Sequence, residues 1–237
     1  MFLSRLRFKR YLDSFPELVE NNVGLRNLVK SSPLDENECP DELSVSLMSY
    51  KDFIDIFALN KKNKAWLDQW TVCQPKGYIY STNDIFSLSN IFSNTIDIYL
   101  NQVLQDKGYF FKISLDGKLC GFICLNDVTR GALCSAKVGY WIAYEFAGRN
   151  IMPVALAMLT DFCFEYLLLH RVEVNICCDN LPSLRVVEKL GFNSEGKRSK
   201  YIFVNGKWAD HYSYALTVED VCCGGVLARY ENSCSCF

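Results

Sequence analysis

Residues 135–160 read SAKVGYWIAYEFAGRNIMPVALAMLT, and the rest of the chain is best interpreted from this stretch. The apolar run 138–142 predicts a buried strand, and the polar or small residues 144–148 predict a tight loop. Apolar residues then recur with the 3.6-residue period of an amphipathic helix, which we expect to end near His170. Pro153 suits the first helical turn, where its missing N–H is not needed.

A strand, a tight loop and a helix N-terminus together form a site for an anion. The N–H groups of residues 149–152 have no partner within the helix, and the helix dipole adds positive potential there. Such an end binds phosphate without requiring a particular side chain. An ordinary strand-to-helix connection is the alternative explanation for this stretch taken alone.

The segments GYWI (139–142) and FAGRNIM (146–152) resemble the acyl-CoA pyrophosphate loop, Gln/Arg-x-x-Gly-x-Gly/Ala, of the GNAT acetyltransferase superfamily. The RimJ/RimL type, the ribosomal-protein N-terminal acetyltransferases, is the most similar subgroup. Asn150 stands where those relatives have glycine. Since Asn tolerates the left-handed region better than other non-glycine residues, we expect a positive φ there. The resemblance implies acetyl-CoA as cosubstrate, bound by Tyr140, Trp141, Ile142, Ala147, Gly148, Arg149, Asn150, Ile151 and Met152.

A second segment, DNLPSLRVVEKLGF (179–192), resembles the RimJ/RimL pattern D-N-x-x-S-x-x-v-x-e-k-x-G-F. The resemblance implies that Asn180 hydrogen-bonds the pantetheine arm. It also implies that Ser183 approaches the thioester sulfur and helps to protonate the departing thiolate. The alternative for Asn180 is a helix cap, and both roles are compatible.

Two further segments resemble the same subgroup. NGKWADH (205–211) is similar to N/D-G-x-W-R-D-H, with Ala209 in place of Arg. It makes Asp210 and His211 candidates for a proton relay, with a hydrogen-bonded pair that holds the hairpin as the alternative. NKAWLDQW (63–70) is similar to a region that borders the substrate cleft in relatives, with two aromatic core residues as the alternative.

Three ionisable groups of the relatives are absent here. Lys137, Val187 and Ile202 stand at positions where relatives carry Glu, Tyr and Glu. Glu173 and Asp210 remain as candidate general bases. The resemblance implies that a backbone N–H near Trp141 or Ile142 stabilises the oxyanion, and that pantetheine pairs with the splayed edge of the same strand.

The composition is that of a globular protein. Of the 237 residues, 50% are apolar and 22% are charged, enough for a substantial core. The net charge of −2 gives no overall attraction to nucleic acid or to an anionic membrane, and no apolar run reaches 18 residues. The basic start is soon followed by Asp13 and Glu17, which argues against a transit peptide.

The twelve cysteines could suggest disulfides or a metal site, but the large size and the absence of a signal-peptide pattern favour a reducing cytosol and hence a cytoplasmic location. Cys120, Cys124, Cys134 and Cys163 lie singly in predicted strands or helices and are expected to be buried. Four more occur in the last 16 residues, but the spacing CC-x10-C-x-C is not a recurring zinc pattern. We therefore expect no metal, and a disordered tail with free thiols.

Three segments follow from these patterns: a helical extension and acidic linker (1–42), a GNAT domain (43–220) and a Cys-rich tail (221–237). Asp116-Gly117 and Asn205-Gly206 predict hairpin turns. The fold class is α/β, with a mixed, mostly antiparallel sheet flanked by helices. Predicted strands are 43–47, 109–114, 118–125, 138–142, 171–176, 201–204 and 208–216, with a loop at 127–133. Predicted helices are 11–30, 51–60, 83–105, 151–170 and 182–190.

The predicted function is acetyl transfer from acetyl-CoA to a primary amine by direct attack in a ternary complex. A protein N-terminus is the leading acceptor and a small amine the next. The alternative is a catalytically weakened acyl-CoA-binding protein with a regulatory or scaffolding role. We expect no nucleic-acid or membrane partner, and a monomer or homodimer.

Overall fold

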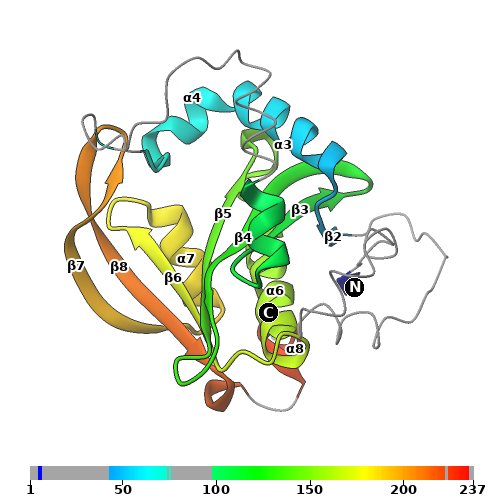
Figure 1. Cartoon of the computed structure of the whole chain (residues 1–237), viewed down its shortest axis with the longest axis vertical. Coiled ribbons are helices and arrows are strands. Elements are labelled where there is room, and N and C mark those ends of the chain that lie inside the picture. The colour runs from blue at the N-terminus through cyan, green and yellow to red at the C-terminus, as the bar shows by residue number, and fades with distance from the viewer. Residues whose placement is uncertain (1–4, 7–42, 74, 76–97, 222–223, 235–237) are drawn as a thin grey trace.

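The computed structural model describes residues 5–6, 43–73, 75, 98–221 and 224–234. They form one mixed sheet in the order β1-β2-β3-β4-β5-β6-β8-β7 (Figure 1). Only β1–β2 and β5–β6 pair in parallel, so the predicted, mostly antiparallel sheet is confirmed. The strands are β1 (Arg5–Leu6), β2 (Leu43–Leu47), β3 (Tyr109–Leu115), β4 (Lys118–Thr129), β5 (Ser135–Ile142), β6 (Arg171–Cys177), β7 (Asn193–Val204) and β8 (Lys207–Thr217).

Helices cover both faces of the sheet. One core lies between the sheet and α6, α7 and α8, and a smaller core lies under α3 and the helical residues 98–104. The α-helices are α3 (Tyr50–Lys62), α4 (Lys64–Leu67), α6 (Ile151–Glu165), α7 (Leu181–Lys189) and α8 (Gly225–Cys234). The 3-10 turns are η2 (Asp68–Trp70), η3 (Tyr144–Phe146) and η4 (Val218–Asp220).

The alternation of side chains along each strand produces these two cores. In β3, Phe111 and Ile113 pack toward α6, whereas Phe110 packs toward α3. In β6, Val172, Val174 and Ile176 are at most 4% exposed. Successive side chains of a strand point to opposite faces, so a strand with apolar residues on both sides must be covered on both sides.

Both predicted hairpin turns are confirmed. Asp116 and Gly117 have φ values of 51° and 72°, and Asn205 and Gly206 have 46° and 80°. Two consecutive residues with positive φ match the right-handed twist of the flanking strands, and Asp-Gly and Asn-Gly adopt them readily.

Several predicted boundaries were wrong. Helix α6 ends at Glu165 instead of near His170, since Leu168 adopts a left-handed φ of 53° and returns the chain toward β6. Strand β4 continues through the predicted loop to Thr129, which pairs with Ser135 beyond a bulge. Strand β7 begins at Asn193, well before the predicted start at residue 201, and pairs with β8 along its length.

Cysteine burial follows the prediction at three of four positions. Cys120, Cys124 and Cys163 are buried free thiols. Cys134 lies before β5 with a φ of 45° and is partly exposed, so the prediction that it is buried inside an element was wrong.

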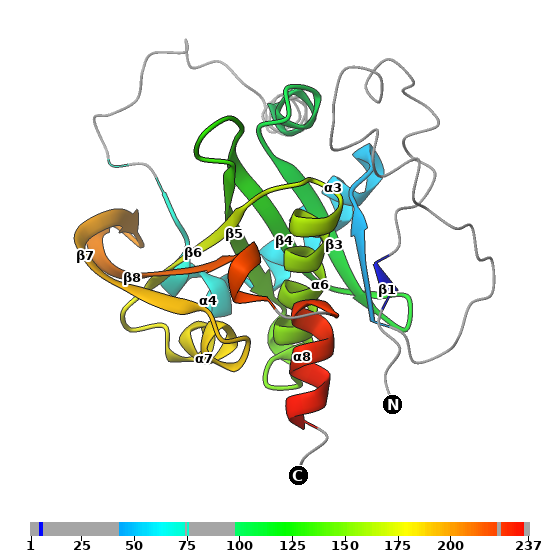
Figure 2. The ribbon, with the colours of Figure 1, turned by 90° about the horizontal axis from the view of Figure 1, so that it is seen from below.

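The expectation of a disordered tail is wrong for residues 225–234, which form α8 beside α6 (Figure 2). Val226 is fully buried and Tyr230 is 7% exposed. The Asp161 carboxylate accepts the N–H groups of Val226 at 2.6 Å and Leu227 at 3.0 Å, which satisfies the helix start. The predicted helix 11–30, the linker 31–42, residues 83–97, Cys222, Cys223 and Cys236 lie outside the described residues.

Candidate active site

The loop from β5 to α6 has the geometry expected of an anion site. Gly148 has a φ of 75°, and Asn150 is the N-cap of α6 with a φ of 58°, so the predicted left-handed conformation is confirmed. The Asn150 side chain makes no cap hydrogen bond with the helix. It accepts instead from Lys189 Nζ at 2.7 Å. The N–H groups of the first turn therefore remain available to an anion beside a lysine.

Strands β5 and β6 part just before this loop. They pair from Ser135↔Arg171 to Val138↔Val174, and no described strand pairs with that edge of Gly139–Ile142. Beyond this point β6 stays paired with β8 as far as Cys177↔His211. Strands β5 and β6 therefore separate, as Figure 1 shows. An unpaired strand edge can hydrogen-bond an extended ligand as an added strand would.

The ladder on the other side of β5 indicates which backbone groups face this opening. Ala143 N–H donates to Cys120 O of β4 at 2.8 Å. The backbone N–H and C=O groups of successive residues point to alternate edges of a strand. Those of Trp141 and Gly139 therefore also point toward β4, whereas those of Tyr140 and Ile142 point toward the opening. Of the two predicted oxyanion donors, Trp141 or Ile142, this alternation favours Ile142.

The α3–α4 junction is attached to the end of β5. Asn63 Oδ1 accepts the N–H of Tyr144 at 2.9 Å, and Trp66 Nε1 donates to Ile142 O at 3.2 Å. The Trp66 ring also meets Tyr144 edge-on, with 5.3 Å between centroids. The segment NKAWLDQW thus borders the opening through both side chains. The contact made by Asn63 was not predicted.

Asn180 caps α7, as the capping interpretation predicts. Its Oδ1 accepts Ser183 N–H at 3.3 Å, while Tyr140 OH donates to Ser183 O at 3.3 Å. Burial raises the pKa of Tyr140, which keeps the phenol protonated as a donor. The bond from Tyr140 joins the backbone of Ser183 to β5. The Ser183 hydroxyl itself has no hydrogen bond among the described residues.

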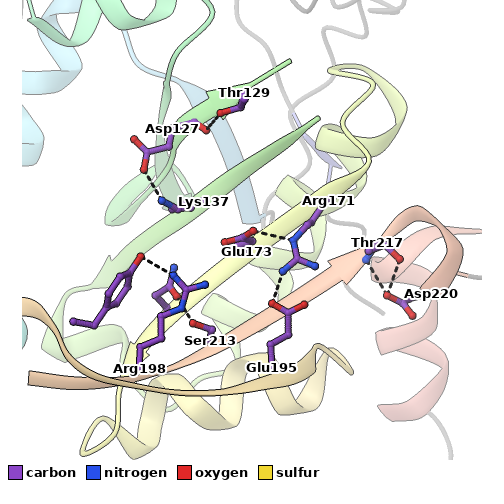
Figure 3. Close-up of polar contacts among 12 residues, drawn as sticks. Asp127, Thr129, Lys137, Arg171, Glu173, Glu195, Arg198, Ser213, Thr217 and Asp220 are labelled. Atoms are coloured by element: carbon purple, nitrogen blue, oxygen red, sulfur yellow. Dashed lines mark hydrogen bonds and ion pairs between the residues drawn. The ribbon is translucent and has the colours of Figure 1, made fainter. Parts of the chain in front are cut away.

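Glu173 lies on the sheet face opposite α6, but it is engaged. Its Oε1 accepts from Arg171 Nε at 2.8 Å, and Arg171 also bridges to Glu195 (Figure 3). Lys137, which replaces the glutamate of relatives, pairs with Asp127 at 2.9 Å. The carboxylates near the β5–β6 junction are therefore held in ion pairs.

Asp210 holds a bulge of β7 in place. Its Oδ2 pairs with Lys197 Nζ at 2.7 Å, and its Oδ1 accepts Lys200 N–H at 2.8 Å. These bonds, that of Lys197 foremost, lower the pKa of Asp210. His211 is 3% exposed, with Nδ1 3.0 Å from Ala209 O. Adjacent strand residues face opposite sides, so this arrangement fits the hairpin-holding alternative better than a relay.

The described part of the chain contains neither a metal-binding cluster nor a membrane-spanning helix. No group of three or more His, Cys, Asp or Glu side chains is arranged to hold a metal ion there. No helix in the described ranges is long and apolar enough to span a membrane.

The site as a whole is defined by a helix N-terminus with open N–H groups beside an unpaired strand edge. This arrangement suits a cofactor with anionic groups at one end and an extended, amide-bearing arm, as in an acyl-CoA-dependent transferase.

The chain is similar to known proteins in sequence and in structure. Residues 43–193 match the acetyltransferase (GNAT) domain. The [Ribosomal protein uS5]-alanine N-acetyltransferase of Escherichia coli is 30% identical over 184 residues, which are 76% of this chain and 90% of that one. The probable N-acetyltransferase YjcK of Bacillus subtilis is 37% identical over 124 residues, 52% and 68% of the two chains.

A solved structure agrees with these relatives. Mycobacterium smegmatis RimJ in complex with CoA-disulfide superposes with a TM-score of 0.70 at 27% identity, covering 81% of this chain and 88% of that one. The chain therefore belongs to the GNAT acetyltransferase family and is similar to the RimJ/RimL type. It is an acetyl-CoA-dependent N-acetyltransferase.

Proposed function

We propose that the enzyme acetylates a primary amine, with a protein N-terminus as the leading acceptor class and a small amine as the second. The parting of β5 and β6 beside the N-terminus of α6 carries this proposal. The name of the E. coli relative, which acts on an alanine of a ribosomal protein, supports the first class. It also supports a cytoplasmic location.

We assign cofactor contacts along this opening. The first turn of α6 and the loop before it, Ala147–Met152, would hold the pyrophosphate, while Tyr140 and Ile142 would pair with pantetheine through the backbone. Asn180 has its Oδ1 on Ser183 N–H, which leaves its amide N–H groups for the pantetheine arm. The Trp141 side chain lies on the sheet face covered by α3, where its ring stacks with that of Phe122.

In the reaction, a bond forms between the amine nitrogen and the acetyl carbon, the C–S bond breaks, and the amine proton ends on the CoA thiol. The Ile142 N–H faces the opening as the oxyanion donor. Ser183, whose hydroxyl has no described partner, is placed to donate toward the sulfur. Glu173 and Asp210 stay as candidate bases, and their ion pairs favour proton loss through water instead.

We keep direct attack as the proposed mechanism, and the two buried thiols of β4 are poor candidates for an acyl-cysteine route. Burial raises the pKa of Cys124 to about 11 and that of Cys120 to about 12. Both therefore remain protonated, weakly nucleophilic thiols near pH 7.

Transfer of labelled acetyl from acetyl-CoA to a panel of peptides and small amines tests this function. Label on the product is required, because twelve cysteines would confound an assay of released thiol. Acetyl-CoA should also raise the melting temperature by binding the folded state. Binding without transfer to any amine would support the non-catalytic alternative, for which the comparisons offer no evidence.

A further inference from the structure

Arg198 and Tyr201 of β7 form a stacked pair on the sheet face opposite α6. The guanidinium carbon of Arg198 lies 4.8 Å from the centroid of the Tyr201 ring, and its Nη1 donates to Tyr201 OH at 3.0 Å. Within the described ranges, no carboxylate lies at ion-pair distance from Arg198. An arginine held by an aromatic ring is a preorganised donor for a planar anion.

The bulge of β7 explains why this pair reaches over the sheet. Arg198 pairs with His211 and Ile202 with Ala209, so β7 contains two more residues than β8 across this interval. Asp210 holds the extra residues through Lys197 and Lys200, and Lys200 has a φ of 49°. The Tyr201 ring then lies edge-on to His211, 6.0 Å between centroids, and helps to bury it.

The pair lies close to the place where β5 and β6 separate. Arg198 pairs with His211 of β8, and His211 pairs with Cys177 of β6, three residues beyond Val174. Val174 is the last residue of β6 that pairs with β5, and the open edge of β5 begins opposite it at Gly139, next to Val138. Figure 3 shows Arg198 on the same face as Lys137, Glu173 and Ser213.

The neighbouring polar groups on this face already have partners. Glu173 and Glu195 share Arg171, Lys137 binds Asp127, and Ser213 donates to Asn175 at 2.7 Å. Arg198, in contrast, binds Tyr201 and forms no ion pair with a described carboxylate. An acceptor seated here for attack on the acetyl group would therefore meet a guanidinium beside its amine.

Resting on the function proposed above, we propose that Arg198, positioned by Tyr201, binds a carboxylate of the acceptor. The acceptor is then a primary amine with a carboxylate close to it. A free amino acid has this chemistry in its α-carboxylate, and a peptide has it in an acidic side chain next to its N-terminus. A guanidinium binds either one through paired N–H···O bonds.

Matched acceptors test the carboxylate requirement. Alanine, methionine and phenylalanine are each compared with their amides, and hexapeptides beginning Ala-Asp are compared with those beginning Ala-Asn. The acid of at least one kind should be preferred by at least about tenfold in kcat/KM, as for a charge-assisted bidentate contact. The kind that shows the preference identifies the source of the carboxylate.

Variants assign the preference to Arg198. Arg198→Met should abolish it and Arg198→Lys should retain part of it, with KM for acetyl-CoA unchanged in both. Tyr201→Phe keeps the ring but loses the hydroxyl, and should weaken the preference. Lys207→Met, an exposed lysine at the hairpin tip, is the matched control and should retain it in full.

Binding to the CoA complex separates this inference from the proposed function. The N-acetylated amino acids and peptides, as acids and amides, are titrated by calorimetry, which needs no turnover. A preference for the acid that Arg198→Met removes supports the inference even if transfer fails. Equal binding and equal kcat/KM for acids and amides, with transfer intact, would overturn it. A lower melting temperature of Arg198→Met with unchanged acid preference would instead assign Arg198 to stabilising the fold.

Discussion

At the residue scale, Asn150 adds a side-chain hydrogen bond to a backbone conformation that glycine could also adopt. It holds the left-handed conformation that starts α6, and its side chain accepts from Lys189 Nζ at 2.7 Å. That bond joins the end of α7 to the loop assigned to the pyrophosphate. The Asn150 side chain therefore holds the ammonium group of Lys189, which lies beside the anion site, in a hydrogen bond.

Substitutions at Asn150 should act in opposite directions. Asn150→Gly removes the cost of positive φ and frees Lys189, so CoA should bind equally or more tightly, by at most about tenfold for 1.4 kcal/mol. Asn150→Val should weaken binding sharply, because a β-branched residue resists positive φ. Isothermal calorimetry with CoA measures both. Equal affinity in all three proteins would contradict a strained phosphate loop.

Ser183 is held from two directions through its backbone, by Asn180 and by Tyr140. If its hydroxyl helps the thiolate to leave, Ser183→Ala should reduce kcat by about tenfold or more while the Kd for acetyl-CoA changes little, because the contact strengthens in the transition state. Transfer of labelled acetyl provides kcat and calorimetry provides Kd.

Tyr140→Phe is the matched comparison, since it removes only the bond to Ser183 O. It should lower kcat less than Ser183→Ala does. An unchanged kcat in Ser183→Ala would restrict this residue to its place in the α7 cap.

At the element scale, α3 is joined to β3 by a charged contact. Asp52 accepts from Ser49 N–H at 2.8 Å and from Ser49 OH at 2.7 Å, and it pairs with Lys112. Burial acts to raise the pKa of Asp52, but the bonds from Lys112 and Ser49 outweigh it and lower the pKa below 3.8. The ionised form is therefore stabilised in the folded state.

Asp52→Asn should lower the free energy of unfolding by about 1–3 kcal/mol at pH 7, as for a lost hydrogen bond to a charged group. A lowered folded pKa contributes stability above the unfolded pKa, and this contribution is lost as the pH falls below about 4. Wild type and variant should thus converge in acid. Urea unfolding at pH 7, 5 and 3 measures this, with exposed Asp55→Asn as control. A constant difference across this range would rule out the linkage.

At the scale of the whole molecule, α8 ties the end of the chain to the helices around the cofactor site. Asp161 of α6 caps α8, and Arg229 of α8 donates to Leu190 O at the end of α7 and to Asp220 O. A Cβ on Gly225 would lie 2.8 Å from the Asp161 oxygens, so glycine permits the close approach. α8 thus connects the elements that carry Asn150 and Ser183.

Asp161→Ala should reduce the free energy of unfolding by about 1–2 kcal/mol, the usual cost of a lost N-cap. Hydrogen exchange at residues 226–230 should accelerate more than exchange in β3 and β4, because the loss is local to α8. Glu165→Ala, an exposed residue on the same helix, should change neither. Unaltered exchange in α8 after loss of Asp161 would show that packing of Val226 and Tyr230 alone holds the helix.

Several features of this protein were determined by the sequence alone, because they depend on neighbouring residues. The turns Asp116-Gly117 and Asn205-Gly206 and the left-handed Asn150 follow from backbone preferences of single residues. Strand β6 and helix α7 follow from the periodicity of apolar residues within short segments. The GNAT fold and acetyl-CoA were indicated instead by a resemblance, that of residues 139–152, 179–192 and 205–211 to RimJ/RimL motifs in the same order. The family match and similar structures confirm both.

Only the tertiary structure decided what the charged residues near the site do. Glu173 and Asp210 are candidates by residue type, but their partners Arg171, Lys197 and Lys200 depend on strand register and on the β7 bulge. Asn63 meets Tyr144 across 81 residues of chain, and Arg198 reaches Tyr201 only because the bulge bends β7. The local pattern of apolar and polar residues predicts which face of a helix or strand a side chain lies on. Which strands pair, where β5 leaves β6 and which charges then meet are set by contacts between distant segments, and these form only when the whole sheet packs.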